Sequence, residues 1–189
     1  MHWSASIILT VVLWQPLLSF AEAPAVPAAA DISVNGVFLY DVESQRRVLG
    51  AEIPFDRQFG LGVATFGSKD GSQLLTIFTH PGGIGDIAEF RIARARRGAR
   101  AIRNIDNIES FATGKGIRLG LSEAEVTSIL GLPLRDHSKG KFRTIEYRIE
   151  DARAKSSQFL SQYNMPIYYG VYTFSNDQLV ALQFGFEYP

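Results

Sequence analysis

The alternation of apolar and polar residues is clearest in the C-terminal half of the chain. From Thr144 to Ile149, Ile145, Tyr147 and Ile149 fall on one side of an extended backbone. The segments 168–174 and 179–186 repeat this alternation with many aromatic residues, on either side of a turn at 175–177. Side chains two apart in a strand share a face, so the pattern predicts a meander of antiparallel strands.

A short helix is predicted directly before these strands. Ser122 and Glu125 have the spacing of a capping box, in which each side chain accepts from the other residue's backbone N–H. Val126 and Leu130 then lie on one helical face, and Gly131 is suited to the left-handed conformation that ends a helix. Residues 151–163 either loop out or form a second helix that carries Phe159, Leu160 and Tyr163.

The first half has a less regular pattern. Residues 37–40 are either a buried strand or the start of a helix that contains Val42 and Leu49, and we favour a short helix that ends at Gly50. Residues 74–79 and 87–92 have the β-branched and aromatic content of strands, with a turn expected at 80–85. The predicted fold class is therefore α+β, with short helices packed on antiparallel sheet.

We divide the chain into four parts. Residues 1–21 have an apolar run and small residues near position 21, as in a cleavable signal peptide; an uncleaved N-terminal anchor is the alternative. Residues 22–31 are rich in Ala and Pro and are expected to form a flexible leader outside the core. Residues 32–105 and 106–189 form an N-terminal and a C-terminal α+β lobe. The protein is therefore expected to be periplasmic or secreted.

The residues around the predicted helix also resemble a family signature. They are Gly116-Ile117-Arg118-Leu119-Gly120-Leu121-Ser122, Glu125-Val126, Ile129-Leu130-Gly131 and Pro133, followed by Tyr147 and the terminal hairpin. This pattern, over residues 116–186, resembles the SmpA/OmlA (BamE-like) family and the helix-then-sheet unit that occurs in tandem in β-lactamase inhibitory proteins (BLIP-like). The resemblance implies protein binding without catalysis. The first half is either a degenerate copy of this unit, giving two tandem lobes, or unrelated to it.

Composition limits the chemistry. The 189 residues contain no cysteine, which excludes disulfides, thiolate metal sites and the lipid-attachment cysteine of lipoproteins, so any membrane contact is expected to be indirect. Beyond residue 21 the histidines are His80 and His137, both in expected turns. We predict no catalytic residue, no metal site and no cofactor; a hydrolase that uses His80 or His137 is the less favoured alternative.

Two groups of residues are candidates for contact with a partner. Arg94, Arg96 and Arg97 lie in an Arg-rich segment that either grips an anionic ligand or is a solvated linker. Tyr169 and Tyr172 lie in a predicted strand, where outward tyrosines either form a binding surface or are covered by the other lobe. Nineteen basic residues balance nineteen acidic ones, which argues against nucleic acid. We expect the partner to be another envelope or secreted protein, with inhibition of a secreted enzyme as the alternative function.

Overall fold

The computed structural model describes residues 27–58, 60–80, 86–150 and 158–187. The predicted signal peptide, residues 22–26 of the leader and most of the expected turn at 80–85 lie outside the described residues. The helices are α1 (Val42–Leu49), α2 (Glu123–Leu130) and α3 (Gln158–Tyr163). The strands are β1 (Ser33–Val34), β2 (Val37–Phe38), β3 (Asp56–Gln58), β4 (Leu61–Gly67), β5 (Gln73–Thr79), β6 (Ile87–Arg94), β7 (Arg103–Asn104), β8 (Arg135–Lys139), β9 (Phe142–Glu150), β10 (Ile167–Ser175) and β11 (Gln178–Glu187).

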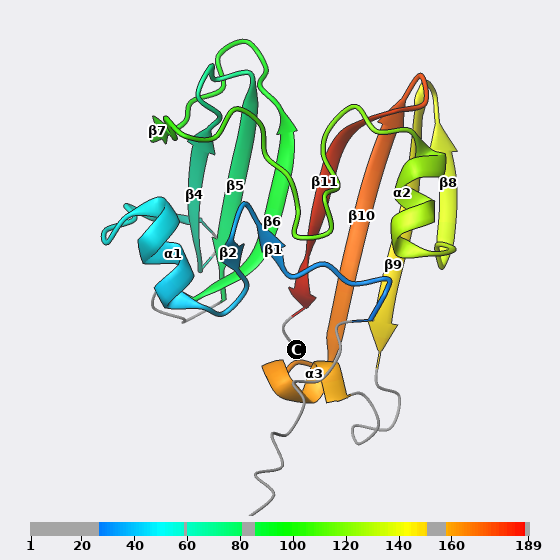
Figure 1. Cartoon of the computed structure of the whole chain (residues 1–189), viewed down its shortest axis with the longest axis horizontal. Coiled ribbons are helices and arrows are strands. Elements are labelled where there is room, and N and C mark those ends of the chain that lie inside the picture. The colour runs from blue at the N-terminus through cyan, green and yellow to red at the C-terminus, as the bar shows by residue number, and fades with distance from the viewer. Residues whose placement is uncertain (1–26, 59, 81–85, 151–157, 188–189) are drawn as a thin grey trace, which may run out of the picture.

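One large sheet runs through both halves of the chain (Figure 1). Its strands follow the order β3-β4-β5-β6-β11-β10-β9-β8, and each neighbouring pair is antiparallel. The halves meet where β11 pairs with β6, from Ala181 beside Ala93 to Gly185 beside Glu89. The predicted α+β class is confirmed, but the sheet is mixed rather than wholly antiparallel, because the short β7 pairs in parallel with β4.

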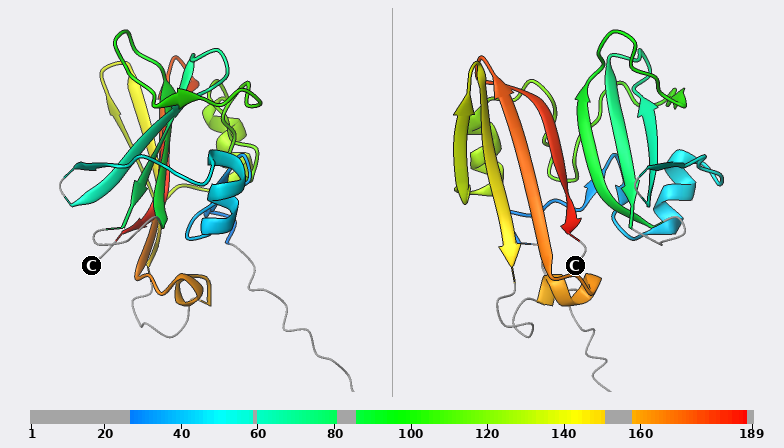
Figure 2. Two further views of the ribbon diagram at one scale, coloured as in Figure 1. Left: turned by 90° about the vertical axis from the view of Figure 1, so that its left-hand side faces the viewer. Right: turned by 180° about the vertical axis from the view of Figure 1, so that it is seen from behind.

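The helices α1 and α2 lie on the same face of the sheet, together with the β1–β2 hairpin (Figure 2). The residues that point to this covered face are almost all apolar and buried, because alternate side chains of each strand share one side. Two cross-strand rows form the centre of the core. They are Phe66, Leu75, Ile92, Leu182, Tyr172 and Ile145, and Ala64, Ile77, Phe90, Phe184, Gly170 and Tyr147.

The capping box predicted for α2 is confirmed. Ser122 Oγ accepts from the Glu125 N–H at 3.3 Å, and Glu125 Oε2 accepts from the Ser122 N–H at 2.7 Å. The Glu125 carboxylate also accepts from the Ser122 hydroxyl at 2.8 Å, and the bonds that it accepts from the N–H and hydroxyl of Ser122 lower its pKa. Val126 and Leu130 are buried against the sheet, and Gly131 ends the helix at φ +86°.

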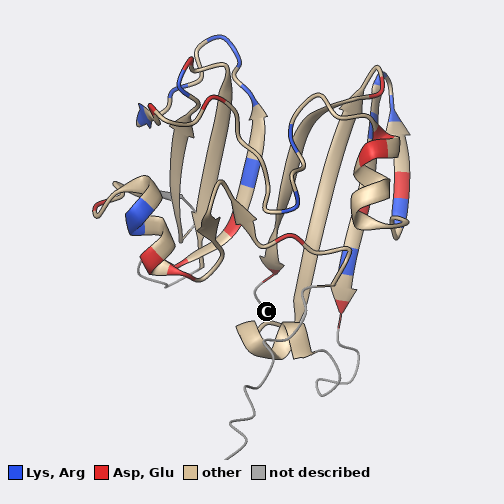
Figure 3. Ribbon diagram, in the orientation of Figure 1, with Lys and Arg blue, Asp and Glu red and all other residues tan. Residues whose placement is uncertain are grey.

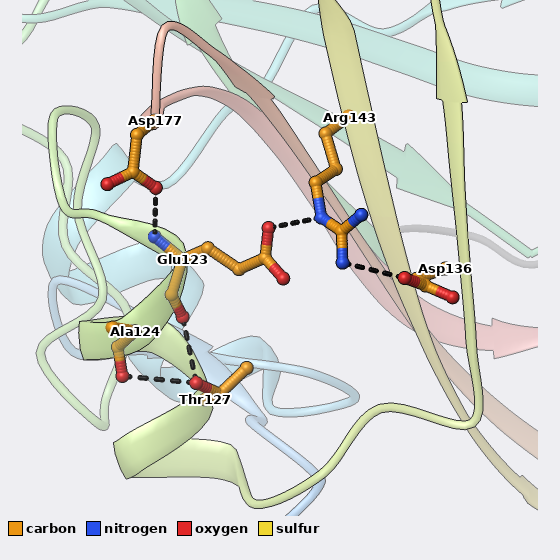
Figure 4. A network of polar contacts seen from close by, with 6 residues as sticks. All are labelled: Glu123, Ala124, Thr127, Asp136, Arg143 and Asp177. Carbon is orange, nitrogen blue, oxygen red and sulfur yellow. Dashed lines mark hydrogen bonds and ion pairs between the residues drawn. The ribbon is translucent and has the colours of Figure 1, made fainter.

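Polar contacts hold the N-terminus of α2 against the edge of the sheet (Figure 4). Arg143 in β9 bridges Glu123 of the helix and Asp136 of β8, at 2.5 and 2.6 Å. Asp177, in the turn before β11, accepts from the Glu123 backbone N–H at 3.2 Å. The helix is therefore tied to β8, to β9 and to the β10–β11 turn.

The short helix favoured in the first half is also confirmed, as α1. Asp41 caps it by accepting from the N–H groups of Glu43 and Ser44 at 3.0 and 3.2 Å, and Gly50 ends it. The alternative reading of 37–40 was right in part, because Val37–Phe38 forms β2 and pairs with β1. A two-residue strand and a helix are thus adjacent, where the sequence suggested a choice between them.

At one end of the sheet, α3 closes the core with aromatic residues. Phe159 and Leu160 are buried, and the rings of Phe159, Tyr163, Tyr168 and Phe186 pack with centroids 4.7–5.8 Å apart. The helical alternative for residues 158–163 is therefore right, whereas 151–157 lie outside the described residues. Within the described chain, no helix combines the length and apolarity needed to span a membrane.

Two features differ from expectation. The edge strand β8 was not predicted, because Arg135–Lys139 is entirely polar and exposed and thus lacks the alternation of a half-buried strand. Ala30 and Asp31, placed in the flexible leader, are 0 % and 2 % exposed. The buried carboxylate of Asp31 accepts from the Ile32 and Lys115 N–H groups, and the core thus begins before residue 32.

Candidate functional site

The sheet face opposite α1 and α2 carries no described helix (Figure 2). We call it the open face. Strand register aligns its side chains in three rows that cross from one half of the molecule to the other. The rows are Leu74, Ala93, Ala181, Thr173, Thr144 and His137; Thr65, Thr76, Arg91, Gln183, Val171, Glu146 and Arg135; and Val63, Phe78, Glu89, Gly185, Tyr169 and Arg148.

A hydrogen-bonded network lies at the centre of the open face, where β6 meets β11 and β10. Tyr169 donates its hydroxyl proton to Glu89 Oε2, and Gln183 Nε2 donates to Glu89 Oε1 at 2.7 Å. Arg91 donates to Gln183 Oε1 from two nitrogens, at 3.0 and 2.8 Å, and its guanidinium lies 5.3 Å from the centre of the Phe78 ring. The network therefore fixes one tyrosine and one arginine on either side of β11, linked through Gln183 and Glu89.

Glycine at position 185 makes this network possible. Gly185 stands between Glu89 and Tyr169 in the third row. A Cβ on Gly185 would lie 2.3 Å from the Ala88 carbonyl oxygen and 2.7 Å from Glu89 Cα, far inside van der Waals contact. Without a side chain there, β11 packs closely on β6, and the Tyr169 hydroxyl reaches across β11 to the carboxylate of Glu89.

Burial dominates the electrostatics of this network. Desolvation raises the pKa of Glu89, although the hydrogen bonds from Tyr169 and Gln183 and the charge of Arg91 act in the opposite direction. Desolvation, together with the neighbouring Glu89 carboxylate, raises the pKa of Tyr169. Tyr169 therefore stays a neutral donor at physiological pH, and its hydroxyl is oriented by a carboxylate instead of being free to rotate.

Beside the network, Arg148 anchors a group of ion pairs toward the end of the sheet nearest α3. It contacts Glu150 and donates to both oxygens of Glu187, at 2.6 and 2.9 Å. Hydrogen bonding from Arg148 lowers the pKa of Glu187. These residues, with Tyr169 and Val171, line a shallow hollow of about 370 Å³. The charge of Arg148 is thus compensated by the two carboxylates that it contacts, Glu150 and Glu187.

Tyr172 does not take part in this surface, which corrects our expectation for that residue. It is 0 % exposed and packs edge-on against Tyr147 on the covered face, with ring centroids 5.7 Å apart. Tyr169 and Tyr172 are three residues apart in one strand, so alternation places them on opposite faces. Of the two tyrosines, only Tyr169 reaches the open face.

The Arg-rich segment is divided by the structure. Arg94 ends β6, and Arg96 and Arg97 lie exposed in the loop that follows. Arg103, in contrast, lies in β7, where it donates to the Leu49 carbonyl oxygen and stands 5.6 Å from the Phe66 ring centre. The segment therefore fits neither the solvated linker nor the anion-binding segment along its whole length, because Arg103 packs within the fold. Arg94, Arg96 and Arg97 have no acidic partner among the described residues.

Arg94 and Arg96 border a second, larger hollow on the open face, which we call the basic groove. It has a volume of about 790 Å³ and runs across β11, β10 and β9 from the end of β6 to β8. Arg97 is not part of its lining. The lining residues are Ala93, Arg94, Arg96, His137, Lys139, Gly140, Lys141, Phe142, Thr144, Thr173, Ser175, Val180 and Ala181.

Glu89 and Gln183 were not predicted as site residues from the sequence, and Arg91 was noted only as the start of the Arg-rich segment. The available signal was local alternation: Phe90 and Ile92 are apolar, so Glu89 and Arg91 had to share the other face of their strand. Their partners are 80 to 94 residues away in sequence. Which strand would lie beside β6 could not be read from that pattern.

The two histidines of the described chain lie in different halves of the sheet. His137 lies in the edge strand β8, 3.7 Å from Glu146, whereas His80 follows β5 in the other half of the sheet. Nowhere in the described residues do three His, Asp or Glu side chains gather in a way that could hold a metal ion. Comparison with known proteins found no matching family model, no matching curated protein and no matching solved structure.

Proposed function

We propose that this chain is an exported, non-enzymatic protein-interaction module of the bacterial cell envelope, and that it binds another envelope or secreted protein through its open face. One observation carries the proposal. A continuous sheet face crossing both halves of the chain is left uncovered by the described helices, and it presents Tyr169, Arg91 and Phe78 rather than only short polar side chains. Tyrosine and arginine are enriched in protein interfaces and at their energetic centres.

The rigidity of this face supports the proposal. Tyr169 and Arg91 are held in position by Glu89 and Gln183, and their strands belong to a sheet that is packed on its other side. A partner would lose little side-chain entropy in ordering such a surface, and preordered contacts bind more tightly than flexible ones of equal area.

Export and the two-lobe organisation are part of the same proposal. Residues 1–21 have the character of a signal peptide, and the absence of cysteine leaves no site for a lipid anchor. In each half a helix precedes a set of antiparallel strands, α1 before β3–β6 and α2 before β8–β11. This order supports a tandem pair of lobes of the kind found in β-lactamase inhibitory proteins, and a kinship of 116–186 with the SmpA/OmlA (BamE-like) family.

A pair of surface variants tests the proposal. Val171→Arg places a long charged side chain in the middle of the open face, and Ala124→Arg does so on the exposed side of α2. The immobilised protein is incubated with solubilised envelope and with culture supernatant, and captured proteins are identified by mass spectrometry. We expect a protein that both wild type and Ala124→Arg retain and Val171→Arg loses.

The other outcomes separate the rival functions. Capture of a hydrolase from the supernatant, with loss of its activity at a one-to-one ratio, would favour an inhibitor of a secreted enzyme. Hydrolytic activity that His80→Ala and His137→Ala abolish would contradict the non-enzymatic proposal. Equal capture by both arginine variants would show that the open face is not the binding surface.

A further inference from the structure

The strongest feature outside the central network is the basic groove. Its two long sides come from elements far apart in the sequence. Arg94 and Arg96 contribute from the end of β6 and the loop that follows, and Lys139 and Lys141 contribute from the end of β8 and the turn that follows. Figure 3 shows blue Lys and Arg segments at these two separate parts of the sheet. No described residue that lines the groove is acidic.

The positive charge of the groove is not neutralised within the described chain. Arg94, Arg96 and Lys139 form no ion pair there, and Lys141 contacts only the ring of Phe142, at 5.4 Å. Outside the lining, Glu146 stands 3.7 Å from the lining residue His137. Since the whole chain has a formal net charge of zero, this concentration of cations is a local asymmetry. A concave surface lined by one sign of charge focuses the field and attracts ions of the opposite sign.

The shape and floor of the groove select among anionic ligands. The cations stand on opposite sides instead of converging on one point, so they suit several negative groups spread along a chain better than a single small anion. The floor supplies hydroxyl groups from Thr144 and Thr173 and apolar contact from Val180, and Phe142, which is 40 % exposed, stands at the rim.

We propose that the basic groove receives an acidic segment of the partner protein, with carboxylates paired to Arg94, Arg96, Lys139 and Lys141 and an apolar or aromatic side chain beside Phe142 and Val180. This inference rests on the proposed function and names the chemistry of the partner. Carboxylates pair with guanidinium groups in a forked geometry, and charge complementarity at an interface sets partner choice and association rate.

The test uses the purified full chain and a fluorescein-labelled acidic peptide of sequence EEYEEFEE, followed by fluorescence anisotropy. Arg94→Gln combined with Lys139→Gln removes one cation from each side of the groove. Arg46→Gln combined with Arg47→Gln removes the same charge from exposed positions on α1, on the covered face. We expect the groove variant to bind about tenfold more weakly than wild type and the α1 variant to bind within about twofold of it.

Further experiments test whether the groove binds the carboxylates of a peptide or the phosphates of a lipid. The peptide QQYQQFQQ has the same shape without carboxylates and should not bind, and binding of EEYEEFEE should weaken as salt is raised from about 0.05 to 0.5 M. Equal weakening in the two double variants, or equal binding of both peptides, would overturn the inference. Groove-dependent binding to phosphatidylglycerol vesicles without peptide binding would overturn it in favour of a lipid ligand.

Capture experiments with the same variants distinguish a failure of this inference from a failure of the proposed function. If Arg94→Gln with Lys139→Gln still captures the partner that Val171→Arg loses, then the open face binds a protein but the groove does not take an acidic segment. If no partner is captured by the wild type while the peptide binds as expected, the groove inference stands and the envelope role fails.

Discussion

The hydroxyl of Tyr168 lies between the two backbone polar groups of Asp31, 137 residues earlier in the chain. It donates to the Asp31 carbonyl oxygen at 2.9 Å and accepts from the Asp31 N–H at 2.8 Å. Both residues are buried. The N-terminal end of the described chain is thus fastened to the start of β10, and two backbone groups that have no strand partner are satisfied by a single side chain.

Replacing Tyr168 by Phe should therefore destabilise the protein, and Tyr172→Phe is the matched control. Both tyrosines are fully buried on the same side of β10, but the Tyr172 hydroxyl has no hydrogen-bond partner in the described chain. We expect Tyr168→Phe to lower the free energy of unfolding by about 2 kcal/mol or more, because it leaves a buried N–H and C=O unpaired. Tyr172→Phe should leave it unchanged or raise it by up to about 1 kcal/mol. Urea unfolding of both variants measures this, and equal losses would contradict the assignment.

Gly185→Ala should be strongly destabilising. The added Cβ would meet backbone atoms of Ala88 and Glu89, which cannot move aside as a flexible side chain would. We expect a loss of about 2 to 3 kcal/mol in the free energy of unfolding, since overpacking forces the two strands apart. Ala181→Ser, which adds one atom on the same strand and face, serves as the control. A Gly185→Ala protein with an unchanged melting temperature would show that β6 and β11 are not packed this closely.

The half-buried Glu89 carboxylate predicts a pH dependence with a defined sign. Its pKa is higher in the folded protein than the ordinary value of 4.5, so the folded state binds a proton more tightly than the unfolded state. This contribution to stability is complete below about pH 4.5 and is lost as the pH rises through the folded-state pKa. Glu89→Gln removes the titration.

Urea unfolding of wild type and Glu89→Gln at a series of pH values checks this. The free energy of unfolding of wild type minus that of the variant should be largest at acid pH and should fall toward neutral pH. Glu187, whose pKa is lowered, affects both proteins equally and cancels in the difference. A difference that does not change with pH would refute the raised pKa of Glu89.

The cap of α2 gives a local prediction. Ser122→Ala removes the oxygen that accepts from the Glu125 N–H, and we expect a loss of about 1 kcal/mol in the free energy of unfolding. Ser122→Gly should cost only a few tenths of a kcal/mol, because glycine is tolerated at this position without a side-chain acceptor. Thermal and urea unfolding rank the two variants; a larger loss for glycine would mean that the cap does not stabilise the helix as described.

Elements that depend on neighbouring residues were predictable. The capping box at Ser122, the helix end at Gly50 and the strands of the final hairpin each result from interactions within a few residues, so the sequence contains the whole signal. The strand Arg135–Lys139 was missed because an exposed edge strand needs no apolar alternation; it is stabilised by hydrogen bonds to β9.

The sequence by itself determined the α+β class, the short capped helices and the fact that Tyr169 and Tyr172 must point to opposite sides of one strand, since these follow from local geometry. Only the tertiary structure decided which of those sides the helices cover, and hence that Tyr169 is outward and Tyr172 buried. It also decided that β11 lies beside β6, which joins Tyr169 to Glu89 and brings Arg94 into one groove with Lys139. Strand pairing between distant segments depends on how all the apolar faces pack together, and no single stretch of sequence carries that information.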